Sequence, residues 1–309
     1  MRWAIPVEEY ISPGNLGCQG CGGALSMRLV LKALGPDTVA VIPACCWSII
    51  DGPFPVHALQ VPVLHTAFET AAIAATGVKA AKDVQGKDTT VVAWAGDGGT
   101  FDIGLQALSG AAERNEDIVY CCYDNEAYMN TGIQRSSSTP PGTWTTTTPD
   151  ERPETRPKKN IMEIMAAHRI PYAATCTGAY PEDMIRKVEK AKSIRGMRFL
   201  HILSACPPGW KMPSERAIEA MRMAVDSGVF PLYEVEDGVR TTITHWPEDG
   251  ADPGRYFEMQ GRFRPLVGDP RLLEEAEAQI AARWEALVER HRRTHGSDRQ
   301  ADTIPIAPV

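Results

Sequence analysis

The sequence predicts an α/β protein in which a parallel β-sheet carries helices on both faces. Two observations predict this fold class. Strand-like apolar runs alternate with helix-like stretches from residue 24 to residue 204, and short loops join most of them. The run at residues 89–95, Thr-Thr-Val-Val-Ala-Trp-Ala, is apolar without alternation, which is typical of a parallel strand buried on both faces. Strands and helices that take turns in this way favour a doubly covered parallel sheet.

The elements follow from residue spacing and composition. Residues 12–23 are rich in Gly and Cys and are expected to be irregular. Asp102 belongs to a residue type that caps helices and is expected to be an N-cap. The expected helices cover residues 24–34, 66–82, 102–114, 161–168 and 181–194, and the expected strands cover residues 39–43, 89–95, 118–123, 171–176 and 198–204.

Two segments break the alternation. Residues 136–160 contain too few apolar side chains for a core element, and a loop of this length is usually functional or disordered. From about residue 230 the chain predicts a hairpin, residues 232–236 and 240–244, and then a charged helix from Pro270 to about His291. We therefore expect a main domain, 1–229, and a C-terminal arm, 230–309, that packs on partner subunits. A solvated C-terminal helix is the alternative.

Composition excludes several classes of protein. The net charge of −7 argues against nucleic acid and against an anionic membrane surface as partners. No apolar stretch has the length that a bilayer span requires, and the first residues lack the apolar core of a signal peptide. We therefore expect a cytoplasmic protein, in which the eight cysteines would not form disulfides.

A Gly-Asp-Gly-Gly sequence, residues 96–99, follows the strand expected at residues 89–95. Ligands of parallel α/β sheets bind at the carboxyl ends of strands. Gly96, Gly98 and Gly99 would let the backbone approach a phosphate closely, and Asp97 offers the hard oxygen that Mg²⁺ prefers. Asn125 follows the next expected strand and can reach the same point. This arrangement predicts a cation that holds a diphosphate.

Four cysteines at loops or element ends suggest a metal centre. Cys-x-x-Cys at Cys18 and Cys21 is by itself ambiguous between zinc, a redox dithiol and an iron–sulfur cluster. Zinc sites usually show a second such pair or two histidines, which are missing at suitable spacing. Adding Cys206 and one of Cys45 or Cys46 supplies the four thiolates of a [4Fe–4S] cluster. The other cysteines, Cys121, Cys122 and Cys176, are expected to be buried core residues.

With these residues the chain resembles the β subunit of the 2-oxoacid:ferredoxin oxidoreductases, and most closely the pyruvate branch. The resemblance implies a thiamine-diphosphate-binding fold, thiamine diphosphate, Mg²⁺, one [4Fe–4S] cluster, a 2-oxoacid substrate, coenzyme A as acceptor and ferredoxin as electron partner. It further implies α and γ/δ-type partner subunits. The matching segments are residues 18–22, 43–48, 65–69, 96–109, 123–149 and 204–208.

The resemblance also implies roles for single residues. Asp97 and Asn125 would give Mg²⁺ side-chain oxygens, and Ala127 its backbone carbonyl. Asn130 would point at the substrate end of the cofactor as the catalytic residue. Cys46, followed by Trp47-Ser48, matches the third cluster ligand, so Cys45 would be a spare thiol.

Several candidates keep two interpretations. His65 and Glu69 lie in a segment that is expected to begin a helix near the cofactor. The alternative is that they form a polar cluster that only caps this helix. The resemblance implies that the Glu that activates thiamine comes from another chain. Arg135 could meet an acidic substrate or the coenzyme, and residues 143–148 could line a diphosphate or coenzyme A route or form a solvated loop. The substrate could be pyruvate, a branched 2-oxoacid, an aryl-glyoxylate or oxalate. The other function classes are a non-redox thiamine-dependent decarboxylase or acyl transferase subunit and a zinc-bearing structural subunit.

Overall fold

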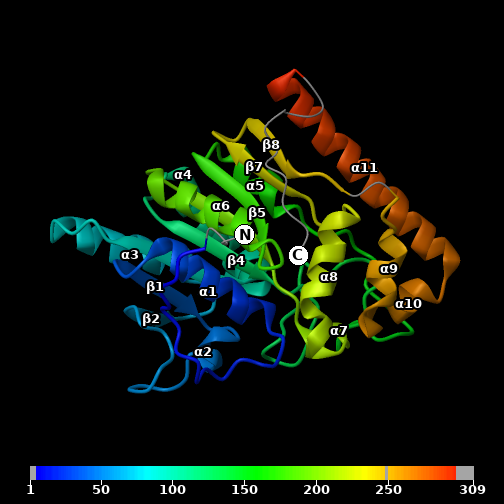
Figure 1. Cartoon of the computed structure of the whole chain (residues 1–309), viewed down its shortest axis with the longest axis horizontal. Helices are drawn as coiled ribbons and strands as arrows, with labels where there is room; N and C mark the ends of the chain where they lie inside the picture. Colours follow the sequence, from blue (N-terminus) through cyan, green and yellow to red (C-terminus); the bar gives the residue numbers. More distant parts are fainter. Residues whose placement is uncertain (1–4, 248–249, 297–309) are drawn as a thin grey trace.

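A computed structural model describes residues 5–247 and 250–296, and one eight-stranded sheet organises this part of the chain (Figure 1). The strand order is β2-β1-β3-β4-β6-β5-β7-β8. The strands from β1 to β6 pair in parallel, which confirms the parallel sheet expected from the sequence. The strands are β1 (Thr38–Pro43), β2 (Val63–Thr66), β3 (Thr90–Gly96), β4 (Val119–Asp124), β5 (Tyr172–Thr177), β6 (Arg198–Leu203), β7 (Leu232–Glu236) and β8 (Arg240–His245).

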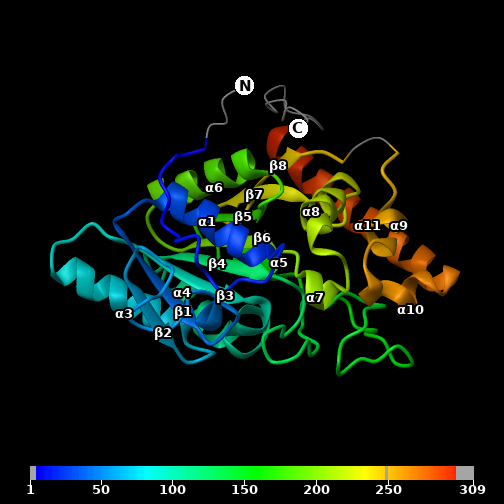
Figure 2. The same ribbon diagram turned by 60° about the horizontal axis from the view of Figure 1, so that its bottom comes forward.

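Helices cover both faces of the sheet. Figure 2 shows α1 and α6 on one side and α3 and α4 on the other. The α-helices are α1 (Gly22–Leu34), α2 (Trp47–Ile50), α3 (Ala71–Val84), α4 (Leu105–Glu113), α5 (Ile161–Ala167), α6 (Pro181–Ser193), α7 (Pro207–Trp210), α8 (Ala217–Asp226), α9 (Pro253–Glu258), α10 (Arg264–Val267) and α11 (Pro270–His295). Three short helical turns complete the set, η1 (Gly98–Ile103), η2 (Ser214–Arg216) and η3 (Gly261–Phe263).

The central strands explain why the sheet is doubly covered. Every residue of β1, β4, β5 and β6 is buried, so neither face of these strands can lie against water. Apolar clusters fill both sides, and a third cluster joins the carboxyl ends of β5 and β6 to helices α8 to α11. Cys121, Cys122 and Cys176 are fully buried in these cores, as expected. No helix in the described ranges combines the length and the apolar composition needed to cross a bilayer.

The C-terminal part continues the sheet. The expected hairpin forms, with β7 antiparallel to β5 and β8 antiparallel to β7, so its strands extend the main sheet. The expected charged helix also forms and runs further than predicted, to His295 as α11, where it packs against β8. An arm that contacts partner subunits stays a prediction.

Two local expectations are wrong. His65 and Thr66 end the edge strand β2, because they pair with β1, and the following helix α3 begins only at Ala71. Asp102 is no N-cap of α4, where Gly104 holds that position. Asp102 lies in η1, and its carboxylate accepts hydrogen bonds from Ser137 and from the Tyr128 hydroxyl instead.

Candidate functional site

The ends of β3 and β4 bring the Gly-Asp-Gly-Gly sequence next to the Asp124-Asn125 sequence. The two strands are neighbours, with Gly96 opposite Tyr123 in register, so the residues that follow leave the sheet side by side. Asp97, Asp124 and Asn125 are all buried there. The sequence-predicted pair, Asp97 and Asn125, therefore does lie at one edge of the sheet, at the carboxyl ends of its strands.

Asp97 is a buried carboxylate that lacks a cation. It is 1% exposed and accepts a hydrogen bond from the Ser136 hydroxyl at 2.5 Å. Within the described residues no Lys, Arg or His forms an ion pair with it. Burial, and then the neighbouring charge of Asp124, raises the pKa of Asp97 well above its ordinary value. A charged carboxylate without a cationic partner is costly in the interior, so a metal ion bound there would stabilise the ionised form of Asp97.

Two further oxygen-bearing groups, the Asn125 amide and the Ala127 carbonyl, lie near Asp97. One terminal atom of the Asn125 amide stands 2.9 Å from the Ala127 carbonyl oxygen and 3.0 Å from Asp97 Oδ1. With the amide nitrogen in that position both contacts are hydrogen bonds; with the amide oxygen there, that oxygen has two other oxygens about 3 Å away. Neighbouring ligands of an octahedral Mg²⁺, with bonds of about 2.0–2.1 Å, stand about 3 Å apart. The donor set and its spacing thus fit Mg²⁺.

Glu126 separates the two candidate ligands and points elsewhere. It adopts the left-handed conformation, φ 69°, which turns the backbone between Asn125 and Ala127. Its carboxylate accepts hydrogen bonds from Lys158 at 2.8 Å and from Arg262 at 2.6 Å. A strained backbone of this kind persists only where its surroundings hold it, and the two cations provide that support.

Asp124, unlike Asp97, is fully compensated. Lys158 Nζ and His201 Nε2 stand 2.6 and 2.7 Å from its Oδ2, and Ser138 donates to both carboxylate oxygens. Burial opposes ionisation, but Lys158 and His201 outweigh it and hold the pKa of Asp124 well below its usual range. Two adjacent buried carboxylates therefore differ, since only Asp97 is left for an incoming cation.

The glycines after Asp97 allow close packing. A Cβ on Gly98 would lie 2.1 Å from the Tyr128 ring, so only glycine fits beside that side chain. Tyr128 in turn donates a hydrogen bond to Asp102 Oδ2 at 2.7 Å. A Cβ on Gly99 or Gly96 would meet Phe68 or Tyr123 at ordinary van der Waals distance or slightly closer. Gly98 is thus the glycine that the fold strictly requires here.

The cysteine-bearing loops also meet, around the start of α1. The Gly22 N–H donates to the Ala205 carbonyl at 2.8 Å, and a Cβ on Gly22 would lie 2.5 Å from the Ala205 nitrogen. This close approach places Cys21, which caps α1 through its Sγ, beside Cys206, which caps α7. Cys18 lies one turn before Cys21 and is exposed.

Cys46 approaches the same place from the end of β1. Burial, followed by the nearby thiols of Cys45, Cys206 and Cys21, raises the pKa of Cys46 to about 12. The described residues include no group of three His, Cys, Asp or Glu side chains close enough to hold a single metal ion. A [4Fe–4S] cluster needs four thiolates, and Cys18, Cys21, Cys46 and Cys206 together supply that number, so a cluster stays a prediction for this region.

The loop after Asn125 lies against the Cys206 loop. A Cβ on Gly209 would lie 2.2 Å from Met129 Sδ and 3.3 Å from Cys206 Sγ. Asn130, which follows Met129, is exposed at the tip of a turn. Backbone hydrogen bonds between Tyr128 and Gln134 close this turn. The structure therefore brings the diphosphate motif, Asn130 and the cysteines to one region.

Two of the three weaker candidate residues have local partners. His65 Nε2 stands 2.9 Å from the buried Asp51 carboxylate, and Glu69 is exposed before α3. Arg135 pairs with the buried Glu154, so its guanidinium is not free for a substrate in this arrangement. In the 136–160 loop, which is irregular as expected, the hydroxyls of Ser136 and Ser138 bond the site carboxylates.

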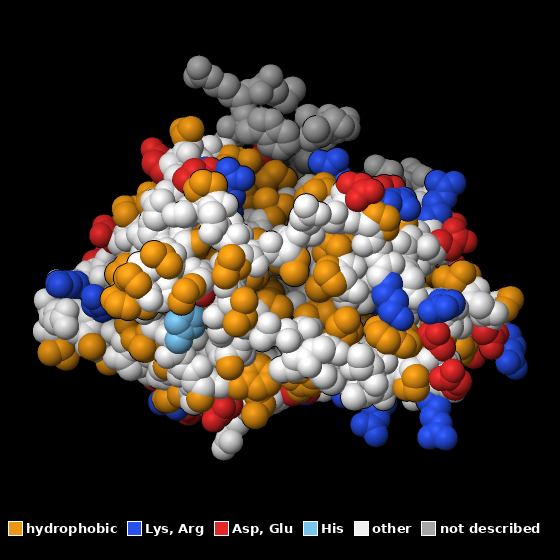
Figure 3. Space-filling view, turned by 90° about the horizontal axis from the view of Figure 1, so that it is seen from below, with side chains coloured by type: hydrophobic (Ala, Val, Ile, Leu, Met, Phe, Trp, Pro, Cys, Tyr) orange, Lys and Arg blue, Asp and Glu red, His pale blue; other side chains and the backbone are white. Residues whose placement is uncertain are grey.

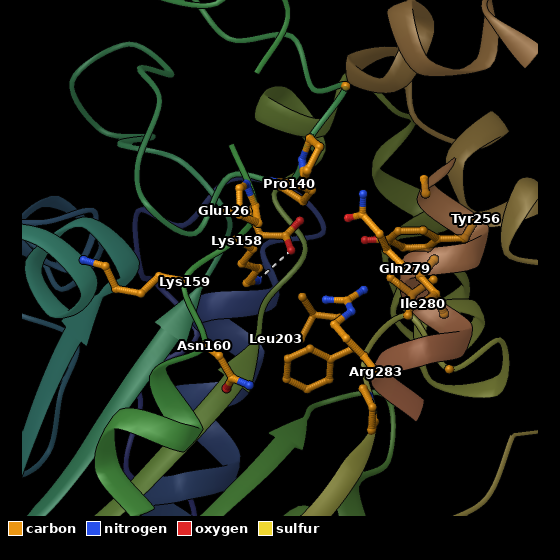
Figure 4. A pocket seen from close by; sticks show the side chains of 18 of the residues that line it. Glu126, Pro140, Lys158, Lys159, Asn160, Leu203, Tyr256, Gln279, Ile280 and Arg283 are labelled. Atoms are coloured by element: carbon orange, nitrogen blue, oxygen red, sulfur yellow. Dashed lines mark hydrogen bonds and ion pairs between the residues drawn. The ribbon is translucent and has the colours of Figure 1, made fainter. Parts of the chain in front are cut away.

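A cavity of about 470 Å³ lies behind Glu126. Figure 4 shows Glu126 and Lys158 on one wall and Arg283, from α11, on the other. Asp97, Asn125 and the cysteines do not line it. The cavity is therefore distinct from the candidate cofactor site, although Glu126, Lys158 and His201 border both.

Sequence reasoning missed several residues that shape the site. Ser136, Ser138 and Lys158 lie in the polar loop, where composition gave no reason to choose them. His201 looks like an ordinary residue of the β6 run. Arg262 comes from a segment without a motif and reaches the site only through the fold.

Comparisons with known proteins agree with this geometry. The family model described as "Thiamine pyrophosphate enzyme, C-terminal TPP binding domain" matches residues 52–202. The ketoisovalerate oxidoreductase subunit VorB of Pyrococcus furiosus is 49% identical over 93% of this chain and 94% of its own length. The pyruvate synthase subunit PorB of Methanothermobacter thermautotrophicus is 49% identical over 86% of this chain and 94% of its own length.

A solved structure supports the fold. A chain of the 2-oxoglutarate:ferredoxin oxidoreductase from Magnetococcus marinus, solved with 2-oxoglutarate, coenzyme A and succinyl-CoA, matches with a TM-score of 0.57. The two sequences are 22% identical, and the match covers 71% of this chain and 82% of that one.

Proposed function

Since the chain belongs to the family of 2-oxoacid:ferredoxin oxidoreductase β subunits that includes PorB and VorB, we propose that it passes electrons from a 2-oxoacid through its own [4Fe–4S] cluster to ferredoxin. It is an oxidoreductase subunit with a thiamine pyrophosphate-binding domain. The observation that carries the finer proposal is the oxygen cradle of Asp97, Asn125 and Ala127 beside the gathered cysteines.

Asp97, Asn125 and Ala127 would hold Mg²⁺, and the backbone of Gly96 to Gly99 would lie against the diphosphate. When bound, thiamine diphosphate supplies the carbanion chemistry that decarboxylates a 2-oxoacid. Asp97 contributes the negative charge that the metal needs, and Ser136 orients that carboxylate through its hydroxyl. Lys158 forms an ion pair with Asp124 and His201 hydrogen-bonds to it, so the second carboxylate does not compete for the cation.

Cys18, Cys21, Cys46 and Cys206 would hold the cluster, whose role is to accept one electron at a time. Tyr123 contacts the Cys46 loop and Gly96, and Met129 lies against the Cys206 loop at Gly209. The Tyr123 hydroxyl accepts a hydrogen bond from the Cys46 N–H, and the Tyr123 ring lies against Gly96. These packed side chains keep water out of the space between cofactor and cluster. Asn130, at the exposed tip of its turn, would face the substrate.

The sequence resemblance puts pyruvate first among the candidate substrates. A branched 2-oxoacid has equal support from the relatives, since relatives of equal identity are named for pyruvate and for ketoisovalerate. Coenzyme A would accept the acyl group. Oxalate, from which no acyl group would remain, and an aryl-glyoxylate complete the set. Substrate contacts are expected largely from a partner chain, so the same β subunit geometry is compatible with each.

This chain has a surface suited to binding partner subunits. Large apolar side chains on and near α2 and β2 are exposed to solvent, which is unfavourable unless another protein covers them. Figure 3, the view from below, shows a face with many hydrophobic and uncharged side chains across its centre. The exposed residues of this region are Leu16, Ile49, Phe54, Val56 and Leu64.

Anaerobic purification tests the proposal. The complex should be brown, contain iron and sulfide, retain thiamine diphosphate, and reduce ferredoxin when a 2-oxoacid and coenzyme A are added. Cofactor-dependent decarboxylation by a protein without iron would support the non-redox alternative, and zinc without thiamine diphosphate would support the structural one.

A further inference from the structure

A buried arginine from the C-terminal part of the chain is linked to both halves of the proposed site, directly through Glu126 and indirectly through Trp210. Arg262, in η3, is 1% exposed. Its Nη2 donates to Glu126 Oε2 at 2.6 Å and its Nε to Gln260 Oε1 at 2.9 Å. The guanidinium carbon lies 4.0 Å from the centroid of the Trp210 ring, a stacked cation–π arrangement.

Through these contacts Arg262 is linked at two points to the loop of residues 125–127, which carries two of the proposed Mg²⁺ ligands. Glu126 lies between Asn125 and Ala127, two of the proposed Mg²⁺ ligands, and needs support for its left-handed backbone. Trp210, which the guanidinium covers, donates its indole N–H to the Asn125 carbonyl at 2.9 Å. One side chain thus supports this loop directly at Glu126 and, through Trp210, at Asn125.

Arg262 also reaches the cysteine loop. Trp210 ends the short helix α7, and its backbone N–H donates a hydrogen bond to the Cys206 carbonyl at 2.7 Å. The guanidinium is therefore one aromatic ring away from a proposed cluster ligand. Its Nη1 makes no hydrogen bond to any of the described residues, and Glu126, which pairs with its Nη2, is shared with Lys158. A charge buried in low dielectric acts over several ångström with little screening.

We propose that Arg262 is a positioning residue that fixes the Mg²⁺-ligand loop relative to the Cys206 loop, and that its positive charge raises the reduction potential of the cluster. The inference rests on the proposed function. A nearby cation stabilises the reduced cluster, which carries one more negative charge than the oxidised one. The same side chain therefore sets both the geometry of the electron donor's site and the electron affinity of the acceptor.

Arg262→Met and Arg262→Lys separate the two effects. In the assembled complex, purified without oxygen, Arg262→Met should make the cluster potential more negative and weaken thiamine diphosphate binding roughly tenfold. Arg262→Lys keeps the charge but loses the planar fork and the stacking, so it should weaken cofactor binding while its potential stays near that of the wild type. The measurements are a redox titration followed by electron paramagnetic resonance and equilibrium binding of thiamine diphosphate with Mg²⁺. Comparison with Cys46→Ala identifies which signal belongs to this chain.

Arg264→Met is the matched control. Arg264 lies two residues further on, is exposed and pairs with Asp150, so neither measurement should change. If Arg262→Met fails to fold, Glu126→Gln tests the sign, because removing the negative partner should make the potential more positive.

Specific results would overturn the inference. The electrostatic part fails if Arg262→Met has the wild-type potential, if Arg262→Lys shifts it equally, or if Glu126→Gln shifts it downwards. Unchanged cofactor affinity in both Arg262 variants would refute the positioning role. A wild-type complex without iron or thiamine diphosphate would instead refute the proposed function.

Discussion

The Tyr123 hydroxyl accepts a hydrogen bond from the backbone N–H of Cys46 at 3.2 Å. Tyr123 belongs to β4, and Cys46 lies at the start of α2, so this bond joins the strand that leads to Asn125 with the loop that carries a proposed cluster ligand. The Tyr123 ring also stacks on Trp94 of β3. The loop of Cys46 is therefore anchored to the two strands that present the diphosphate site.

The anchoring of Cys46 leads to a prediction that separates it from its neighbour. Cys46→Ala should abolish the brown colour and electron transfer, because a [4Fe–4S] cluster needs four thiolates. Cys45→Ala should keep both, since Cys45 is the spare thiol in this assignment. Iron and sulfide analysis with the visible spectrum measures the outcome. Equal loss of iron in both variants, or loss only in Cys45→Ala, would show that the ligand was assigned wrongly.

A second prediction concerns Asp97. It provides the anionic group among the proposed Mg²⁺ ligands, so Asp97→Ala should weaken thiamine diphosphate binding by more than about 100-fold, beyond the loss typical of outer-shell changes. Chelation of Mg²⁺ should release the cofactor from the wild type in the same way. Equilibrium binding by fluorescence or calorimetry measures both.

Asp88→Ala is the control for Asp97, because Asp88 is exposed and pairs only with the exposed Arg195 in the described structure. It should bind the cofactor as the wild type does. Normal cofactor retention in Asp97→Ala would mean that the metal is held elsewhere.

The sequence could predict Asp97 and Asn125 as partners because consecutive strands, β3 and β4, are also neighbours in the sheet. The alternating strands and helices could also be predicted, because local composition and periodicity mark each of them. Arg262 could not be predicted, since it is 136 residues from Glu126 and no local pattern marks it. The edge strand β2 was missed because it is four residues long and only partly buried, so it lacks the apolar run that identifies the inner strands. The edge on which the hairpin pairs, beside β5, depends on tertiary packing and not on local pattern.

The third prediction tests the close approach at Gly98. Gly98→Ala should destabilise the protein by about 1–3 kcal/mol, because the new methyl group would lie 2.1 Å from the Tyr128 ring and force it away. Displacement of Tyr128 would also break its bond to Asp102, so the diphosphate loop should loosen and cofactor affinity should fall. Thermal unfolding and cofactor binding measure the two effects.

Gly77→Ala is the matched control for Gly98. Gly77 lies inside α3, and a Cβ there would have no atom within 4 Å. Alanine favours a helix interior over glycine by about 0.5–1 kcal/mol, so this variant should be slightly more stable. Wild-type stability in Gly98→Ala would show that Tyr128 moves at no cost.

The fourth prediction is that this chain is inactive alone and uses the exposed apolar surface around α2 to bind a partner. The Glu that activates thiamine is expected from another chain, so the isolated chain should show no 2-oxoacid-dependent reduction of a viologen dye.

The partner surface is tested at Phe54, which is 90% exposed. Phe54→Asp should prevent co-purification of partner subunits while the circular dichroism spectrum and thermal unfolding stay unchanged. Val84→Asp is the control, since Val84 is equally exposed but ends α3. Dye reduction by the chain alone at the rate of the complex, or normal assembly of Phe54→Asp, would contradict this prediction.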